Sequence, residues 1–146
     1  MNSTIQQFIQ GQKAATLCCV DAEGHPYCWT CFFAFDAEKG LLYFKTGAAS
    51  HHTALMLQNP KLAGTILPDK LNALAIQGVQ WEGQLLPENH ELEKSASFTY
   101  HKRYPFALAK PGDVYTVQLE HIKMTDNTKG FGTKIHWHRS ELSEKS

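Results

Sequence analysis

Residues 14–47 constrain the fold most, because two short polar connectors divide this apolar run into three segments of strand length. The run reads AATLCCVDAEGHPYCWTCFFAFDAEKGLLYFKTG, with connectors at residues 21–24 and 36–40. Asp and Gly at this spacing are typical of the turns that join antiparallel strands. The pattern therefore predicts a three-stranded antiparallel meander that begins a sheet-based fold.

The rest of the chain adds strands and a few short helices. We expect strands at residues 61–67, 73–86 and 113–124, and a short alternating segment before residue 138. Helices are expected at residues 3–12 (capped by Ser3 or Thr4), 50–59 and 88–103. Gly78 and Gly83 interrupt the long strand, where glycine marks a bulge, a bend or a nearby ligand. The sum is a mainly β (α+β) fold, a six- to seven-stranded antiparallel barrel closed by helices.

Composition limits the classes of protein that this chain can represent. Its 146 residues, 42% of them hydrophobic, suit one domain, which we place at residues 1–139, with a disordered polar tail at 140–146. Fourteen basic and fourteen acidic residues give no net charge, which argues against general nucleic-acid binding. No apolar run is long enough to span a membrane, and residues 1–13 do not resemble a signal peptide. We therefore expect a cytoplasmic protein.

The four cysteines are Cys18, Cys19, Cys28 and Cys31. Cys28 and Cys31 have the spacing of a redox or metal pair, but residues 26–35 are predicted to be a strand. Side chains three positions apart on a strand point to opposite faces, which separates the two sulfur atoms. A zinc site built from Cys18, His25, Cys28 and Cys31 stays open as an alternative. We favour cysteines packed within the sheet.

Residues 41–60 combine a strand, a small-residue turn and a helix that begins at Ser50 and stops before Pro60. The first turn of such a helix presents free backbone N–H groups, which attract a phosphate. Lys45, Thr46, Ser50, His51 and His52 surround this point, and each can donate a hydrogen bond. The segment is thus a candidate phosphate site, and an ordinary strand-to-helix connection is the alternative.

The order of these motifs resembles a known superfamily. The motifs are residues 14–26, the strand LYFKT, a Ser-led helix ending in Asn59-Pro60, the strand LAGTI and the segment GVQWEG. Together they are similar to the FMN-binding split barrels of pyridoxamine 5′-phosphate oxidase and its relatives. The segments YHKRYP (100–105) and IKMTDNTKGFG (122–132) are most similar to the small YhbP-like proteins of that superfamily.

The resemblance implies a homodimer with two FMN sites at the subunit interface. It places Lys45 and Thr46 beside the flavin, and Ser50, His51 and His52 at its phosphate. The strand at residues 29–33, which includes Phe32, would present its backbone to the isoalloxazine ring. Gln80 and Trp81 lie in the strand that closes the site, and Lys129 is a further candidate near the flavin.

One departure from the superfamily concerns the phosphate site itself. Pyridoxamine phosphate oxidases have Ser-Arg-Lys where this chain has Ser50-His51-His52. Arginine is always charged and grips phosphate with a two-pronged fork, whereas histidine is only partly charged near neutral pH. We therefore expect weaker, pH-sensitive FMN binding. Pyridoxamine phosphate oxidase activity is not expected, because residues for the phosphate of that substrate are not evident. The resemblance implies a flavin-dependent oxidoreductase whose small-molecule substrate the sequence does not reveal, and it identifies no catalytic residue.

Two alternatives remain open at this point. One is a haem-binding or haem-handling split barrel with iron ligands among His51, His52, His136 and His138, because imidazole binds iron. The spacing of His136 and His138 is equally explained by a strand that faces solvent. The other alternative is a flavin-binding protein without turnover.

Overall fold

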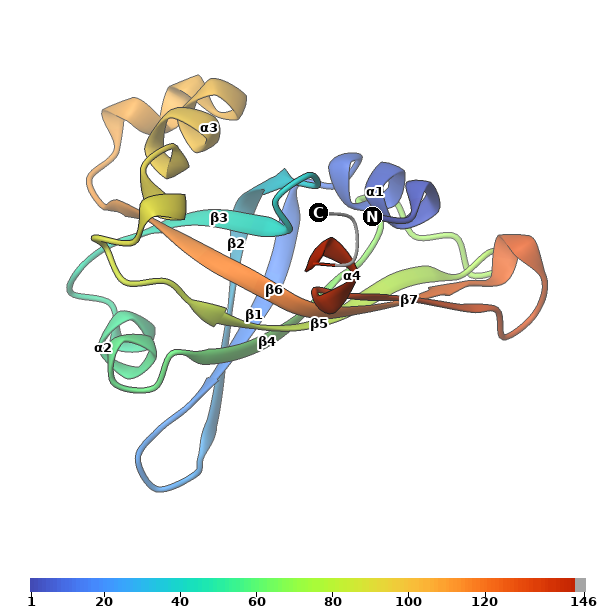
Figure 1. Ribbon diagram of the computed structural model, residues 1–146, viewed down its shortest axis with the longest axis horizontal. Helices are drawn as coiled ribbons and strands as arrows, with labels where there is room; N and C mark the ends of the chain where they lie inside the picture. The colour runs from blue at the N-terminus through green and yellow to red at the C-terminus, as the bar shows by residue number, and fades with distance from the viewer. Residues whose placement is uncertain (144–146) are drawn as a thin grey trace.

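The computed structural model describes residues 1–143, and its centre is a closed antiparallel barrel (Figure 1). The seven strands are hydrogen-bonded in the order β3-β2-β1-β4-β5-β6-β7, and an additional pairing of β3 with β6 closes six of them into the barrel. The seventh, β7, extends the sheet beyond β6. The predicted fold class is confirmed.

The predicted meander is present as β1 (Ala14–Val20), β2 (Pro26–Asp36) and β3 (Leu41–Thr46). Asp21 shapes the first turn, since its carboxylate accepts hydrogen bonds from the backbone N–H groups of Glu23 and His25. Gly24 and Gly40 have φ values of 87° and 64°, a left-handed conformation that glycine adopts without strain. The two Asp/Gly connectors therefore form turns for the reason that the sequence suggested.

The second half of the barrel is built around one long strand. β6 (Asp113–Asp126) pairs with β3, with β5 (Gln77–Leu85) and with β7 (Lys134–His138), while β4 (Lys61–Ile66) joins β1 to β5. A register shift between Glu82 and Gly83 marks a β-bulge, one of the features expected of the strand glycines. Two 3₁₀ turns, η2 (Pro105–Ala109) and η3 (Asn127–Lys129), lie just before and just after β6.

The structure corrects three local predictions. Helix α1 (Ser3–Gln10) is capped by the Asn2 side chain, which accepts from two backbone N–H groups, and not by Ser3 or Thr4. Residues 73–76 are not part of β5, because Asn72 accepts hydrogen bonds from Leu74 N and Ala75 N and turns the chain. The predicted helix over 88–103 is divided into the 3₁₀ turn η1 (Glu91–Glu93), where His90 caps Leu92 N, and α3 (Ala96–Arg103).

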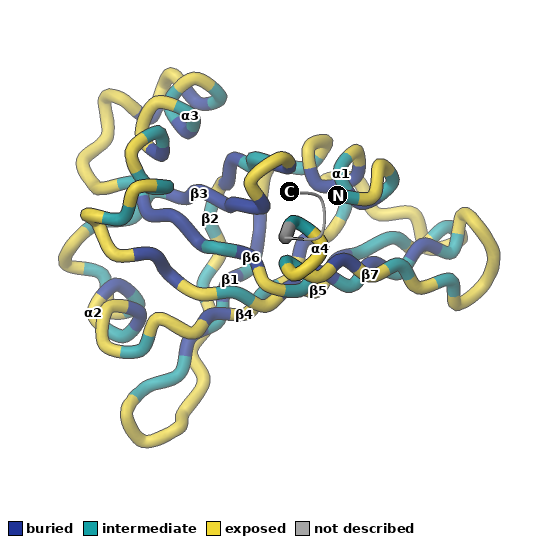
Figure 2. Tube along the Cα trace, viewed as in Figure 1, coloured by how far each residue is buried: buried dark blue, intermediate teal, exposed yellow. Residues whose placement is uncertain are grey.

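Two hydrophobic clusters stabilise this arrangement (Figure 2). The larger fills the barrel and includes side chains from α1 and from α2 (His51–Gln58), which cover its openings. The smaller lies outside the barrel, where Leu41 and Tyr43 of β3 pack against Tyr100 and Tyr104 of the α3 region. Successive side chains of β3 thus alternate between the two hydrophobic clusters.

Helix α4 (Ser140–Ser143) begins the segment that was predicted to be a disordered tail, and residues 144–146 lie outside the described residues. None of the helices in the described part of the chain combines the length and apolar character that a bilayer crossing requires.

Candidate cofactor site where β2 and β3 separate

The candidate site lies where β3 leaves β2. β2 pairs with β1 from Pro26 to Phe32, but it pairs with β3 only from Phe33 to Asp36. In the described residues, the far edge of β2 at residues 27–31 therefore has no neighbouring strand. Unpaired N–H and C=O groups at such an edge are free to bind a polar ligand.

Helix α2 begins beside this open edge. As the first two residues of the helix, His51 and His52 have backbone N–H groups without an intrahelical acceptor. Ser50 occupies the N-cap position, but its hydroxyl makes no capping hydrogen bond. The turn is held instead by Thr53, whose hydroxyl donates to the Gly47 carbonyl over 2.8 Å. The helix is anchored, and its N-terminal donors are left available.

Aromatic contacts connect the helix to the open strand. The imidazole of His52 stacks on the indole of Trp29, with ring centroids 4.3 Å apart and planes within 6°. His51 meets Tyr27 edge-on at 4.9 Å. On the other side of His52, its Nε2 lies 2.6 Å from the hydroxyl oxygen of Thr46. Strand β2, strand β3 and helix α2 thus converge on one histidine.

The environment of His52 favours its neutral form. Partial burial lowers its pKa below the usual histidine value, and the neighbouring His51 lowers it further. A neutral His52 can accept the Thr46 hydroxyl proton at Nε2. A bound phosphate dianion would raise the pKa of His52 and favour protonation of its ring.

These residues fit a phosphate-bearing cofactor. Phosphate oxygens accept hydrogen bonds, and the site offers the Ser50 hydroxyl and the N–H groups of His51 and His52 as donors. Trp29 adds a second indication, because its buried indole nitrogen has no hydrogen-bond partner among the described residues. A buried donor without a protein partner is explained by a water, an ion or a ligand, and the indole nitrogens of Trp81 and Trp137 are in the same position.

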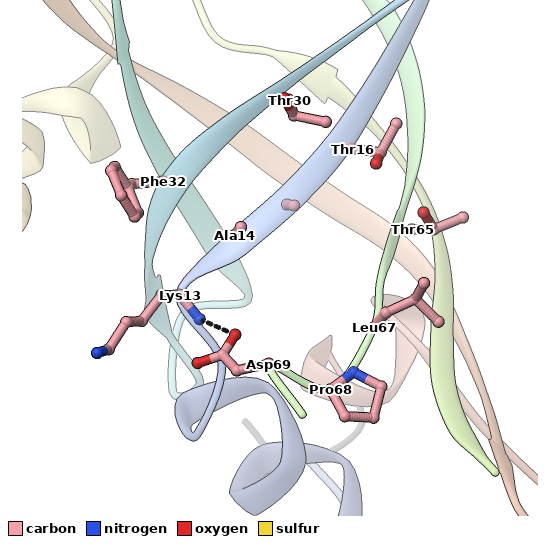
Figure 3. A pocket seen from close by; sticks show the side chains of 10 residues that line it. Lys13, Ala14, Thr16, Thr30, Phe32, Thr65, Leu67, Pro68 and Asp69 are labelled. Carbon is pink, nitrogen blue, oxygen red and sulfur yellow. Dashed lines mark hydrogen bonds between the residues drawn. The ribbon is translucent and has the colours of Figure 1, made fainter. Parts of the chain in front are cut away.

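A second surface lies on the outer face of the sheet, the side that points away from the barrel core. Two cavities of about 550 and 640 Å³ occupy it and share Thr16 and Thr65 in their lining. In Figure 3, Thr30, Thr16 and Thr65 lie next to one another across β2, β1 and β4. Small side chains leave this face shallow and open.

The structure brings together four of the nine predicted cofactor-binding residues, namely Thr46, Ser50, His51 and His52. Lys45 does not join them, since successive side chains of a strand alternate between faces. Its ammonium group instead donates to the Ala107 carbonyl over 2.7 Å and lies 3.0 Å from His101 Nε2. Lys45 is thus directed to the α3 side of the sheet.

The other four predicted residues are dispersed. Phe32 and Gln80 line the two outer-face cavities, and Phe32 also packs against Tyr104. Trp81 is buried in the barrel core. Lys129 donates to the hydroxyl of Thr4 in α1 over 2.9 Å, and Figure 1 shows α1 and α2 on different sides of the barrel.

The cysteines are arranged as strand packing predicts. Cys28 is exposed on the outer face, whereas Cys31 belongs to the inner face, where burial raises its thiol pKa to about 12. Within residues 1–143, Cys18, His25, Cys28 and Cys31 do not form a group of closely spaced ligand atoms. The sequence did not suggest that Cys18 and Cys28 would be cross-strand partners. The ladder is centred on Glu23, whereas centring it on the Asp21–Gly24 turn would have paired Cys18 with Tyr27.

Comparison with known protein families shows to which family the chain belongs. The family model for pyridoxamine 5′-phosphate oxidase matches residues 1–126. The chain belongs to this family. A UPF0306 protein of Serratia proteamaculans is 37% identical over 145 residues, which cover 96% of this chain and all of that protein.

Solved structures share the fold at low sequence identity. A haem-binding protein from Mycobacterium smegmatis has a TM-score of 0.76 at 12% identity, covering 94% of this chain but only 57% of the other. An FAD-binding protein from Mesorhizobium loti has a TM-score of 0.64 at 14% identity, covering 85% of this chain and 94% of the other. Members with this fold thus include both haem-binding and flavin-binding proteins.

Proposed function

We propose that the protein binds FMN where β2 and β3 separate. The observation that carries the proposal is the convergence of the free Ser50 hydroxyl, the α2 N-terminus and the Thr46–His52 pair beside the open edge of β2. Membership in the pyridoxamine 5′-phosphate oxidase family and the flavin-binding neighbour support it.

Each part of the site has a distinct task in this proposal. Ser50 and the N–H groups of His51 and His52 hold the phosphate, while the open backbone edge of β2 hydrogen-bonds the polar rim of the flavin. Bound FMN would supply hydride or single-electron transfer, and the chain supplies binding and orientation.

We further propose that two copies form a dimer that completes each site. Phe32 is 46% exposed on the outer face, next to cavities with largely apolar walls, and such a surface suits contact with a second copy. A partner would also supply groups, such as Gln80 or Lys129, that one subunit keeps away from α2. The substrate of the resulting oxidoreductase would be a small molecule other than pyridoxamine phosphate, because residues for that substrate's phosphate are not evident in the sequence.

Titration of the purified protein with FMN tests the proposal. We expect quenching of flavin fluorescence and a rise in melting temperature, both reduced in Ser50→Ala and in His52→Ala. Ser95→Ala is the matched control, since Ser95 is also an N-cap serine without a capping bond but precedes α3. Light scattering on the same samples measures the proposed dimer separately.

Two results would contradict flavin binding at this position. One is the absence of any fluorescence or melting response to FMN. The other is equal affinity in the wild type and both α2 variants. An NAD(P)H oxidation assay on the FMN-loaded protein then separates an oxidoreductase from a flavin-binding protein without turnover.

Haem binding is the second candidate function, supported by the haem-binding neighbour from Mycobacterium smegmatis. Exposed His51 supplies an accessible imidazole at the same site. A Soret band on addition of haemin, lost in His51→Ala and accompanied by no response to FMN, would favour this function over the flavin proposal.

A further inference from the structure

Three histidines gather on the outer face of the sheet, at the opposite end from α2. His121 of β6 lies directly opposite His138 of β7, and His136 is two residues before His138 on the same face. One ring nitrogen from each of the three lies within 4.8 Å of the other two. The spacing in the sequence indicates His136 and His138 as a pair but not His121, because the register of β6 with β7 is a tertiary property.

The spacing of these nitrogens is close to that of a metal site. His121 Nε2 and His136 Nδ1 are 3.0 Å apart, and a tetrahedral ion with bonds of 2.0–2.1 Å separates its ligands by about 3.3 Å. A hydrogen bond within a neutral histidine pair would explain this approach, but it leaves the third ring unexplained. The ring of His138 lies over that of His121, with centroids 4.5 Å apart.

The rings have to turn before they can share an ion. Their planes are now parallel to within 10°, whereas a metal lies in the plane of each imidazole that binds it. His136 and His138 are exposed, so rotation about χ2 meets little resistance. The β6–β7 pairing ends at His121 and His138, and beyond it the Arg139 N–H donates to the Glu120 carbonyl, so the two strands stay together at the cluster.

We propose that His121, His136 and His138 bind one divalent cation of the Zn²⁺ type. Three imidazoles leave the fourth position of a tetrahedral ion open for water or another small ligand, as in zinc sites with three histidine ligands. Imidazole also suits Cu²⁺ and Ni²⁺, so the donor set selects this class of metal over Mg²⁺ or Ca²⁺. The site does not depend on the flavin proposal.

The surroundings of the cluster bear on its charge and access. Glu82 of β5 is the cross-strand partner of His121 and adds a negative charge, whereas Lys123 is the partner of His136 and opposes a cation. His121 and His136 line the outer-face cavity of about 640 Å³. An ion held by them would therefore lie at the margin of this cavity.

Zinc and cobalt titrations of the full chain test the proposal. We expect one Zn²⁺ per chain by calorimetry, and visible absorption bands of four-coordinate Co²⁺ that Zn²⁺ abolishes. His136→Gln and His138→Gln are the decisive variants, because both side chains are exposed and the fold does not depend on them. Each should weaken Zn²⁺ binding by at least about tenfold. His121→Gln should do the same.

His25→Gln is the matched control, since His25 is another exposed histidine of the sheet region, at the β1–β2 turn. It should keep the wild-type affinity. The proposal would be overturned by unchanged Zn²⁺ affinity in His136→Gln or His138→Gln, or by an equal loss of affinity in His25→Gln. Binding of several Zn²⁺ ions per chain, as scattered surface histidines would give, would also overturn it.

Discussion

The imidazole of His52 lies parallel to the indole of Trp29, at a centroid distance of 4.3 Å, while its Nε2 approaches the Thr46 hydroxyl to 2.6 Å. This arrangement fixes the ring between two strands and keeps it partly away from water. The pKa of His52 is lowered as a result, first by burial and then by His51. A phosphate bound at α2 would raise the same pKa.

FMN affinity should therefore increase as the pH falls from about 8 toward about 6.5, because binding is coupled to proton uptake by His52. The measurement is FMN affinity against pH by fluorescence quenching, with riboflavin as the control ligand that lacks the phosphate. His52→Gln should remove most of the pH dependence for FMN. An equal pH dependence for riboflavin would assign the effect to another group.

The stability of the free protein should change with pH in the opposite sense. A histidine with a lowered pKa in the folded state stabilises the fold above its unfolded pKa of about 6.5, and this contribution is lost as the pH falls through the folded pKa. Urea unfolding at about pH 7.5 and about pH 5 should show a smaller decrease in His52→Gln than in the wild type. Identical decreases would mean that His52 titrates normally in the folded protein.

Cys18 and Cys28 should form a disulfide under mild oxidation. They are direct partners in the β1–β2 ladder, and such pairs have Cα atoms about 4.5–5.5 Å apart, within the range of a disulfide. Cleavage before Asp21 places the two on separate peptides, so mass spectrometry detects the bond. Cys28→Ser should abolish it and Cys31→Ser should not, since Cys31 lies on the opposite face of β2 and its raised thiol pKa disfavours the reactive thiolate. A crosslink through Cys31 would contradict the strand geometry.

Gly64 should tolerate no side chain. A Cβ atom at this position would collide with the Thr16 carbonyl and with the ring of Trp81, both fixed by the barrel. Gly64→Ala should lower the free energy of unfolding by about 1–3 kcal/mol or more. Gly78→Ala on the neighbouring strand is the control, because its Cβ would only touch Leu67 Cδ2 at 3.5 Å. Similar losses in both variants would indicate a general cost of replacing strand glycines.

The sequence determined the local elements and the family. Asp21 and Gly40 mark turns through properties of their own residues, and Ser50 and Pro60 bracket a helix for the same kind of reason. The predicted strand at 73–76 failed because the side chain of Asn72 turned the chain, a competition that hydrophobicity does not reveal. Motif order also sufficed to identify the superfamily, which the match over residues 1–126 confirmed.

Only the tertiary structure decided which side chains meet. Lys45 and Thr46 are adjacent in sequence, yet the closed barrel directs one to α3 and the other to α2. Trp29 reaches His52 because β3 separates from β2 at Phe33, and His121 reaches His138 through the register of β6 with β7. Pairing partners and register depend on contacts between residues far apart in the chain, and local residue preferences do not specify such contacts.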